Sequence, residues 1–415
     1  MLGKYQKFIL FTNMELKKIQ QNNLIQFYRQ TVNGTVTYTF DSPKKVRGIK
    51  IKFLGEAKTE WTESESVKND ETGKTEERRN EVTGNEEYYQ ITYYLMGGVN
   101  SAETELPAGA HSFPFTCALP PQLPSSFEGE FGYVRYTIKV TLDRPWKFDQ
   151  DTKMAFTVIS PVDLNMMEKA REPFKLPMEK TFCCWCCASQ PLSVIVSVPV
   201  TGYVSGQSIP IIAEIDNQSN VDLEKVKFQF RKHTAFHTTS PKMTKNVVNS
   251  IGELALGPFN KGEQRTIRQS LEIPPLPGSN MMNCGIIDLH YDLFVVCEVS
   301  GFHTNLDGVI PITIGTIPLK DYTPQPPSNQ QSFDISMMPT QPVSPETSGG
   351  AVGWNMGDNS LYPNIPPPTF SEADFHAKSI KDKHDNEHTR LIGNQESFAP
   401  RYPVYTYQPT APRMD

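Results

Sequence analysis

The segment of residues 124–165 carries the pattern that most constrains how this 415-residue chain can fold. Apolar and polar side chains alternate over ten consecutive positions. The apolar positions are Val134, Tyr136, Ile138, Val140 and Leu142, and the polar ones are Arg135, Thr137, Lys139, Thr141 and Asp143. A period of two predicts a strand with one face in a core and the other in water. Pro145 cannot donate to a ladder of hydrogen bonds, so strand pairing is expected to end before it.

Similar alternation recurs along most of the chain. It is found at residues 35–40, 49–53, 91–95, 225–231 and 289–295, with turn residues between these runs. Short strands at regular intervals favour β-sandwich domains. Residues 62–87 are rich in Glu, Lys, Asn and Gly. Because this stretch is long and polar, it is expected to form a mobile hairpin tip.

Composition places the chain among cytosolic globular proteins. Hydrophobic residues make up 38% of the sequence, which is enough for packed cores, and the net charge of −6 does not point to nucleic acid. No apolar run reaches the roughly 18 residues of a membrane-spanning helix, and the N-terminus lacks the features of a signal peptide. The seven cysteines, four of them within five residues, do not resemble a secreted disulfide framework.

The amino-acid sequences of several segments resemble those of one protein family. Residues 124–165 contain FEGEFGYVRYTIKVTLDRPWKFD and FTVISPVDLN, and residues 44–61 read KKVRGIKIKFLGEAKTEW. These stretches resemble the N-terminal domain of arrestin domain-containing proteins, the alpha-arrestins. GYVSGQSIPI, LEIPPLP, NCGIIDLHYDL and IPITIGTIPL, further along the chain, resemble the C-terminal domain of the same family. The resemblance implies an all-β fold of two tandem immunoglobulin-like, arrestin-type β-sandwiches.

The expected domain boundaries follow from these segments. We expect an N-terminal sandwich over residues 5–165, a linker over 166–181 and a C-terminal sandwich over 182–320. Residues 321–415 are rich in Pro, Ser, Gln and Asn and show little alternation. Such a segment buries too little apolar surface to offset the entropy of ordering, about 1–2 kcal/mol per residue for the backbone. The tail is therefore predicted to be disordered and to act through short linear motifs.

The family resemblance implies a non-enzymatic adaptor in membrane-protein trafficking. Its partners would be cytosolic tails of membrane proteins, Nedd-type HECT ubiquitin ligases and ESCRT components. The chain would be cytoplasmic, with peripheral recruitment to the plasma membrane and endosomes, and would need no cofactor. No P-loop, dinucleotide-binding, zinc-protease or serine-hydrolase motif is found in the sequence. The alternative is a structural, coat-like or retromer-like scaffold with the same sandwich fold and no ligase recruitment.

Two tail motifs would serve the adaptor role. Pro366, Pro367, Pro368 and Phe370 occupy the place of the PPxY element that alpha-arrestins use to bind WW domains, with phenylalanine in place of tyrosine. The prolines of such a motif adopt a preformed extended helix that lies between aromatic rings of the domain. The lost hydroxyl is expected to weaken binding by up to about tenfold. A second motif of ESCRT type, P-[TS]-A-P, consists of Pro409, Thr410, Ala411 and Pro412.

Two further clusters are candidates for binding. The basic set of Lys44, Lys45, Arg47, Lys50 and Lys52 is either a solvated outer face or a contact for an anionic headgroup or phosphorylated cargo. The cysteine cluster consists of Cys183, Cys184, Cys186 and Cys187. It is open to three interpretations: buried thiols at the start of a strand, reversible acylation beside Trp185, or a zinc site completed by Cys284 or Cys297. The sequence predicts no catalytic residues and no other metal ligands.

Overall fold

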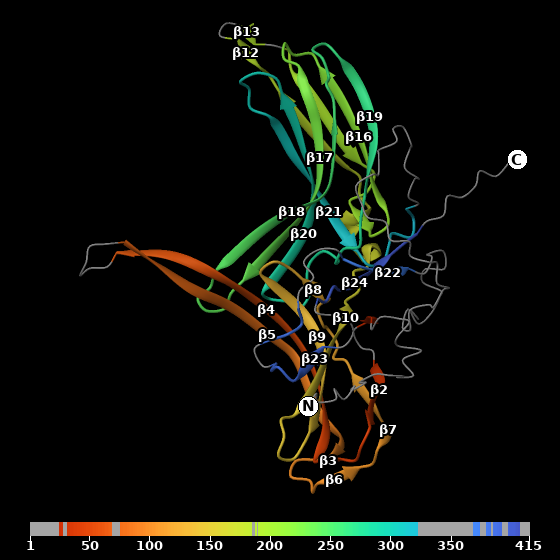
Figure 1. Cartoon of the computed structure of the whole chain (residues 1–415). Helices are drawn as coiled ribbons and strands as arrows, with labels where there is room; N and C mark the ends of the chain where they lie inside the picture. Colours follow the sequence, from red (N-terminus) through yellow and green to blue (C-terminus); the bar gives the residue numbers. More distant parts are fainter. Residues whose placement is uncertain are drawn as a thin grey trace, which may run out of the picture.

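The computed structural model contains two β-sandwich domains arranged end to end (Figure 1). It describes residues 25–27, 31–68, 75–184, 187–188, 190–322, 368–373, 379–382, 385–391 and 397–406. Almost all of the regular structure in these residues is strand. The predicted all-β class with two arrestin-type sandwiches is confirmed.

The N-terminal domain is built on a large mixed sheet in the order β1-β10-β9-β4-β5. Its strands are β1 (Ile25–Phe27), β2 (Thr31–Phe40), β3 (Lys44–Val46), β4 (Gly48–Lys68), β5 (Thr75–Gly97), β6 (Thr104–Leu106), β7 (Gly109–Ala118), β8 (Phe127–Glu128), β9 (Gly132–Asp143) and β10 (Gln150–Ile159). The pairs β2–β7 and β3–β6 form smaller sheets. The rings of Phe53 on β4 and Phe115 on β7 lie 5.8 Å apart, which places the β2–β7 pair over the core face of the large sheet.

The C-terminal domain follows a short helical connection, η1 (Leu164–Met166) and α1 (Glu168–Arg171). Its strands are β11 (Phe174–Lys180), β12 (Cys183–Cys184), β13 (Cys187–Ala188), β14 (Leu192–Val198), β15 (Gly202–Val204), β16 (Ser208–Asn217), β17 (Leu223–His237), β18 (Thr244–Leu256), β19 (Gln264–Glu272), β20 (Ile287–Val299) and β21 (Leu306–Gly315). Two sheets, ordered β11-β14-β16-β19 and β15-β21-β20-β17-β18, form the sandwich. Alternate side chains of β14 and β17 are buried between them, as period-two strands require.

The prediction of a linker over residues 166–181 is wrong for its second half, because β11 occupies that half. This strand pairs antiparallel with β14 along its whole length. Phe174, Leu176 and Met178 alternate with charged residues and Pro177. Proline is tolerated here because β11 is at the edge of its sheet. The proline, which suggested a linker, instead marks an edge strand.

The predicted mobile tip at residues 62–87 is also different in the structure. β4 continues to Lys68 and β5 begins at Thr75, and the two pair along the whole ribbon. Figure 1 shows this ribbon extending beyond the rest of the domain. Most of its outer side chains are exposed on both faces, so it lacks the apolar alternation that signals a strand. Residues 69–74 lie outside the described part of the chain.

The two domains share one hydrophobic core cluster and several polar contacts. The hydroxyl of Thr59 on β4 donates to the carbonyl of His237 at the end of β17, at 2.6 Å. The carboxylate of Glu86 on β5 accepts from the backbone N–H of Gly285. A β-bridge joins Thr83 to Ser240. The inner part of the β4–β5 ribbon is therefore fastened to the C-terminal domain.

The described tail segments depart from the disorder that the tail composition predicts. Three short strands, β22 (Thr369–Glu372), β23 (Thr389–Leu391) and β24 (Arg401–Val404), lie against the domains. β23 pairs parallel with β10, and Ile380 and Phe398 are buried beside Ala155. A few buried side chains hold these segments against the domains. The average composition of a long segment does not reveal such isolated positions.

β8 and the tail together explain why the outer face of β9 is not in water. The inner residues of the alternation, from Val134 to Leu142, are buried as predicted. Arg135, Thr137 and Thr141, predicted to be solvated, are buried as well. Arg135 forms a two-pronged ion pair with Glu128 on β8, and tail residues lie over the strand close to Lys139. The alternation correctly identifies the core face, but it does not report what covers the other face.

Candidate functional site: a lysine pocket on the N-terminal domain

Three lysines lie in one row across the large sheet of the N-terminal domain. Lys52 on β4 is directly opposite Lys139 on β9, and Lys139 is opposite Lys153 on β10. Like charges placed directly across adjacent strands repel one another, so the row needs anions to offset it. Lys50 lies two residues from Lys52 on the same face of β4. We call the space around these four side chains the lysine pocket.

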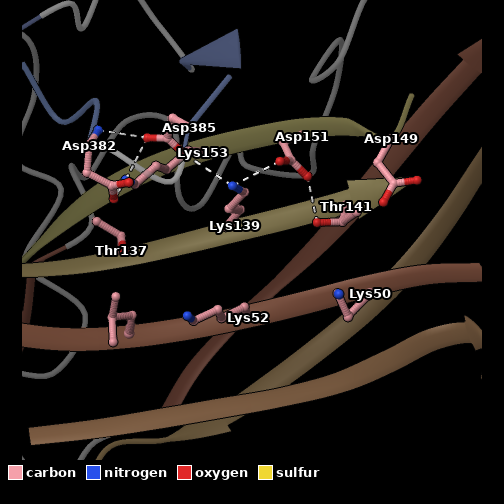
Figure 2. Close-up of a pocket in the computed structure, with 11 residues that line it drawn as sticks. Lys50, Lys52, Thr137, Lys139, Thr141, Asp149, Asp151, Lys153, Asp382 and Asp385 are labelled. Atoms are coloured by element: carbon pink, nitrogen blue, oxygen red, sulfur yellow. Dashed lines mark hydrogen bonds and ion pairs between the residues drawn. The ribbon is translucent and has the colours of Figure 1, made fainter. Parts of the chain in front are cut away.

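Carboxylates from the tail satisfy two of these lysines. The Nζ atom of Lys153 lies 2.5 Å from Asp382 and 2.9 Å from Asp385. The Nζ atom of Lys139 lies 3.1 Å from Asp385 and 2.9 Å from Asp151, whose other oxygen accepts from the hydroxyl of Thr141 at 2.7 Å. Figure 2 shows this chain of contacts across β9 and β10. The side chain of Asp385 is only 1% exposed, so the tail carboxylate fills the pocket rather than covering its rim.

The charge on Lys139 is stabilised by its partners. Burial alone lowers the pKa of Lys139, but the hydrogen bonds and charges of Asp151 and Asp385 outweigh burial and leave the pKa raised. The ammonium group therefore stays protonated throughout the physiological range. A positive charge at this position is what an anion-binding site requires, and here the neighbouring carboxylates maintain it.

Lys50 and Lys52 make no ion pair or hydrogen bond with any residue that the structure describes. Both line the same pocket, whose volume is about 290 Å³. Four lysines and four aspartates line it, the aspartates being Asp149, Asp151, Asp382 and Asp385. These formal charges balance while the tail is in place, and removal of the two tail aspartates would leave two positive charges in excess. The pocket is therefore a candidate anion site that the chain itself occupies.

The structure divides the predicted basic set into separate groups. Arg47 pairs with Asp143 at the surface, 2.6 Å apart, and the hydrogen bond and charge of Asp143 raise the pKa of Arg47. Lys44 and Lys45 lie on β3, which pairs with β6 in another sheet. Only Lys50 and Lys52 reach the pocket. Sequence reasoning missed Lys139 and Lys153, because only the strand register shows that they share a row with Lys52.

The cysteine cluster lies at the distal end of the C-terminal domain, at the top of Figure 1. Cys183 and Cys184 form β12 and Cys187 begins β13, with Cys184 paired to Cys187. The side chains of these cysteines, and Cys186 as a whole, lie outside the described residues. Cys297 is buried in the C-terminal domain, where burial raises the pKa of its thiol to about 12. Among the described residues, no group of three or more His, Cys, Asp or Glu side chains could hold a metal ion.

The tail motifs are only partly described. Pro368 precedes β22, and Phe370 lies within this strand opposite Pro403 of β24. Pro366, Pro367 and the four residues Pro409, Thr410, Ala411 and Pro412 lie outside the described residues. None of the helices in the described part of the chain has the length and apolar character needed to cross a membrane.

Comparison with known proteins agrees with this architecture. The family model described as "Arrestin (or S-antigen), N-terminal domain" matches residues 17–165, and the corresponding C-terminal domain model matches residues 188–319. Arrestin domain-containing protein 17 of Caenorhabditis elegans is 29% identical over 92% of this chain and 96% of its own length. Arrestin domain-containing protein 4 of Mus musculus is 29% identical over 84% of this chain and 83% of its own. With both domain models matched in order over most of its length, the chain belongs to the arrestin family, as an arrestin domain-containing protein of the alpha-arrestin type.

Proposed function

We propose that this chain is a non-enzymatic cytoplasmic adaptor in membrane-protein trafficking. Its arrestin domains bind cytosolic segments of membrane proteins, and its tail recruits Nedd-type HECT ubiquitin ligases, ESCRT components or both. Recruitment to the plasma membrane and endosomes would be peripheral. The observation that carries the proposal is the presence of both arrestin domains in the family's order, together with an arrestin domain-containing relative that aligns over nearly the whole chain.

The lysine pocket supplies the contact with cargo in this proposal. Lys50 and Lys52 line it without a described partner, while Lys139 and Lys153 are held by tail carboxylates. An acidic or phosphorylated segment of a membrane protein carries anionic oxygens, as Asp382 and Asp385 do. Such a segment would gain charge-assisted hydrogen bonds to as many as four ammonium groups.

Proximity labelling in cells tests the cargo contact. The full-length protein is compared with a Lys50→Gln/Lys52→Gln variant, and Lys147→Gln, at an exposed lysine outside the pocket, is the matched control. We expect the double variant to label fewer membrane proteins, and the control to label the same set as the wild type. Equal labelling by all three proteins would contradict the cargo role of the pocket.

Pull-down with isolated WW domains tests the recruiting role of the tail. Phe370→Tyr restores the missing hydroxyl and is expected to strengthen WW binding by up to about tenfold, whereas Pro367→Ala is expected to weaken it. In a second pull-down, with the full-length protein as bait in cell lysate, deletion of residues 409–412 is expected to remove ESCRT components. If none of these three changes alters what is retained, and the protein elutes instead in large complexes that do not need the tail, the scaffold alternative is the correct one.

A further inference from the structure

Residues 397–406 cross the junction of the two domains and are fastened to both. On the N-terminal side, the hydroxyl of Tyr402 donates to the carbonyl of Ser126 at 2.9 Å, and the N–H of Arg401 donates to the hydroxyl of Thr157 at 3.2 Å. On the C-terminal side, the hydroxyl of Tyr405 donates to the carbonyl of Thr316 at 2.8 Å. In Figure 1, β24 lies at the level where the two sandwiches meet. We call the surface that receives this segment the tyrosine seam.

The seam encloses both tyrosines. Tyr402 is 2% exposed and Tyr405 is fully buried. The backbone N–H of Tyr405 also donates to the carbonyl of Ser205, at 3.0 Å. The next residue, Gly206, has φ of +89°, and a Cβ atom there would lie 2.3 Å from the carbonyl oxygen of Tyr405. Glycine is therefore required at the floor of the seam, where another backbone approaches closely.

These contacts have the character of peptide recognition. One backbone hydrogen bond to the wall of the seam aligns an extended segment, and two pockets receive aromatic rings in the sequence Tyr402-Pro403-Val404-Tyr405. A carbonyl oxygen accepts from the hydroxyl group of each ring, so the pockets favour tyrosine over phenylalanine. The segment is joined to Tyr322, the last described residue of the C-terminal domain, by the 74 residues 323–396.

We propose that the tyrosine seam is a binding site for extended Tyr-Pro-x-Tyr peptides, occupied here by the chain's own tail. The covalent connection gives the tail an effective concentration on the order of millimolar. A peptide from another protein therefore competes poorly until the tail leaves. The partner is a protein that carries an unstructured Tyr-Pro-x-Tyr segment with unmodified tyrosines, because a phosphate has no room against a carbonyl acceptor.

Occupancy of the seam also controls the WW-type motif, a consequence that rests on the proposed function. β22 pairs with β24, so Phe370 lies opposite Pro403 and Ser371 lies opposite Tyr402. Arg401 of β24 also forms an ion pair with Glu372 of β22. A WW domain binds its ligand as an extended polyproline-type helix, which is incompatible with this strand pairing. A Tyr-Pro-x-Tyr partner that displaces β24 therefore frees Phe370, and by linkage a WW domain favours binding of that partner by the same factor.

Titration of a labelled peptide tests the site itself. The probe is a fluorescent peptide of residues 397–406, SFAPRYPVYT, added to the full-length protein. The Tyr402→Ala/Tyr405→Ala variant removes the two anchors of the tail and leaves the walls of the seam intact. We expect saturable binding to this variant and at least tenfold weaker binding to the wild type. A probe with both tyrosines replaced by phenylalanine is expected to bind the variant about tenfold more weakly.

Adding Gly206→Val to the double variant is expected to abolish binding of the probe. An unchanged far-ultraviolet circular dichroism spectrum and a cooperative thermal transition would show that this variant is folded. The proposal is overturned if the folded double variant does not bind the probe, or if wild type and variant bind it equally. A parallel titration with a WW domain is expected to give tighter binding to the double variant than to the wild type. If no WW domain binds any of these proteins, the proposal that the tail recruits a ligase is wrong. The peptide titration tests the tyrosine seam independently of that result.

Discussion

Replacement of Asp385 by asparagine separates the charge of the tail from its shape. The Asp385 carboxylate is 1% exposed and lies 3.1 Å from the Nζ atom of Lys139 and 2.9 Å from that of Lys153. Removing one partner of a buried ion pair costs about 3–5 kcal/mol, because a charge is left without compensation. Lys139 keeps Asp151 and Lys153 keeps Asp382, so we expect the lower end of this range, about 3 kcal/mol.

This cost falls on the docking of the tail rather than on the whole fold. The segment of residues 379–391 meets the N-terminal domain through β23, the two aspartates and the small cluster around Ile380. Local opening requires only these contacts to break. A loss of about 3 kcal/mol corresponds to a population of the open state that is about 100-fold higher. The tail segment would then exchange its amide hydrogens about 100-fold faster.

Hydrogen exchange followed by mass spectrometry measures this effect. Peptides that cover residues 385–391 are expected to exchange faster in Asp385→Asn, while peptides from β17 and β20 keep their wild-type rates. Asp382→Asn is expected to have a smaller effect, because the Asp382 side chain is 26% exposed. Asp288→Asn, at an exposed carboxylate paired with His237, is the control and should leave the tail unchanged.

Two outcomes would refute the reasoning. If Asp385→Asn exchanges at the wild-type rate in residues 385–391, the carboxylate does not hold the tail on the lysine pocket. If exchange instead rises throughout the N-terminal domain, the tail is part of the cooperative unit of folding and does not open locally.

Two further changes test the buried charges of the domains. Glu128→Gln breaks the buried pair with Arg135, whose two hydrogen bonds are 2.6 and 2.8 Å long, and should lower the free energy of unfolding by about 3 kcal/mol in denaturant titrations; Glu253→Gln, at a more exposed ion pair, should lower it by less than about 1 kcal/mol. Burial lowers the pKa of Lys232, which shares a small pocket with Glu130, to about 8. Between pH 8 and pH 10 the unfolded chain therefore holds a proton that the folded chain has released, and this raises the free energy of unfolding by about 2 kcal/mol over that window. Lys232→Met should remove this rise, and an unchanged pH dependence would contradict the assignment.

The parts of the fold that were predictable are those that depend on local periodicity. Val134, Tyr136 and Val140 are buried because a strand at a core face must alternate, and that requirement is written in consecutive residues. Such a signal survives wherever one face of a strand is apolar. It fails for the outer half of the β4–β5 ribbon, where neither face packs on a core and the strands are held by pairing with each other.

The candidate site was predictable only in part, for a different reason. Lys50 and Lys52 can be placed on one face from their spacing alone. Lys139 and Lys153 join them through the register of three strands, and Asp385 joins Lys139 across 246 positions of sequence. Neither register nor such a distant contact can be derived from composition or periodicity.

The lysine row indicates that binding of the tail stabilises the N-terminal domain. Three lysines directly opposite one another on adjacent strands destabilise a sheet through repulsion, and two of them are largely buried. Asp151 of the same sheet offsets only part of this charge, and Asp385 and Asp382 offset the rest. When the tail leaves, that repulsion returns unless another anion takes its place. A partner can therefore release the tail in one of two ways. It can place its own anionic group in the lysine pocket, or it can bind the tail tightly enough to outweigh the repulsion among the lysines.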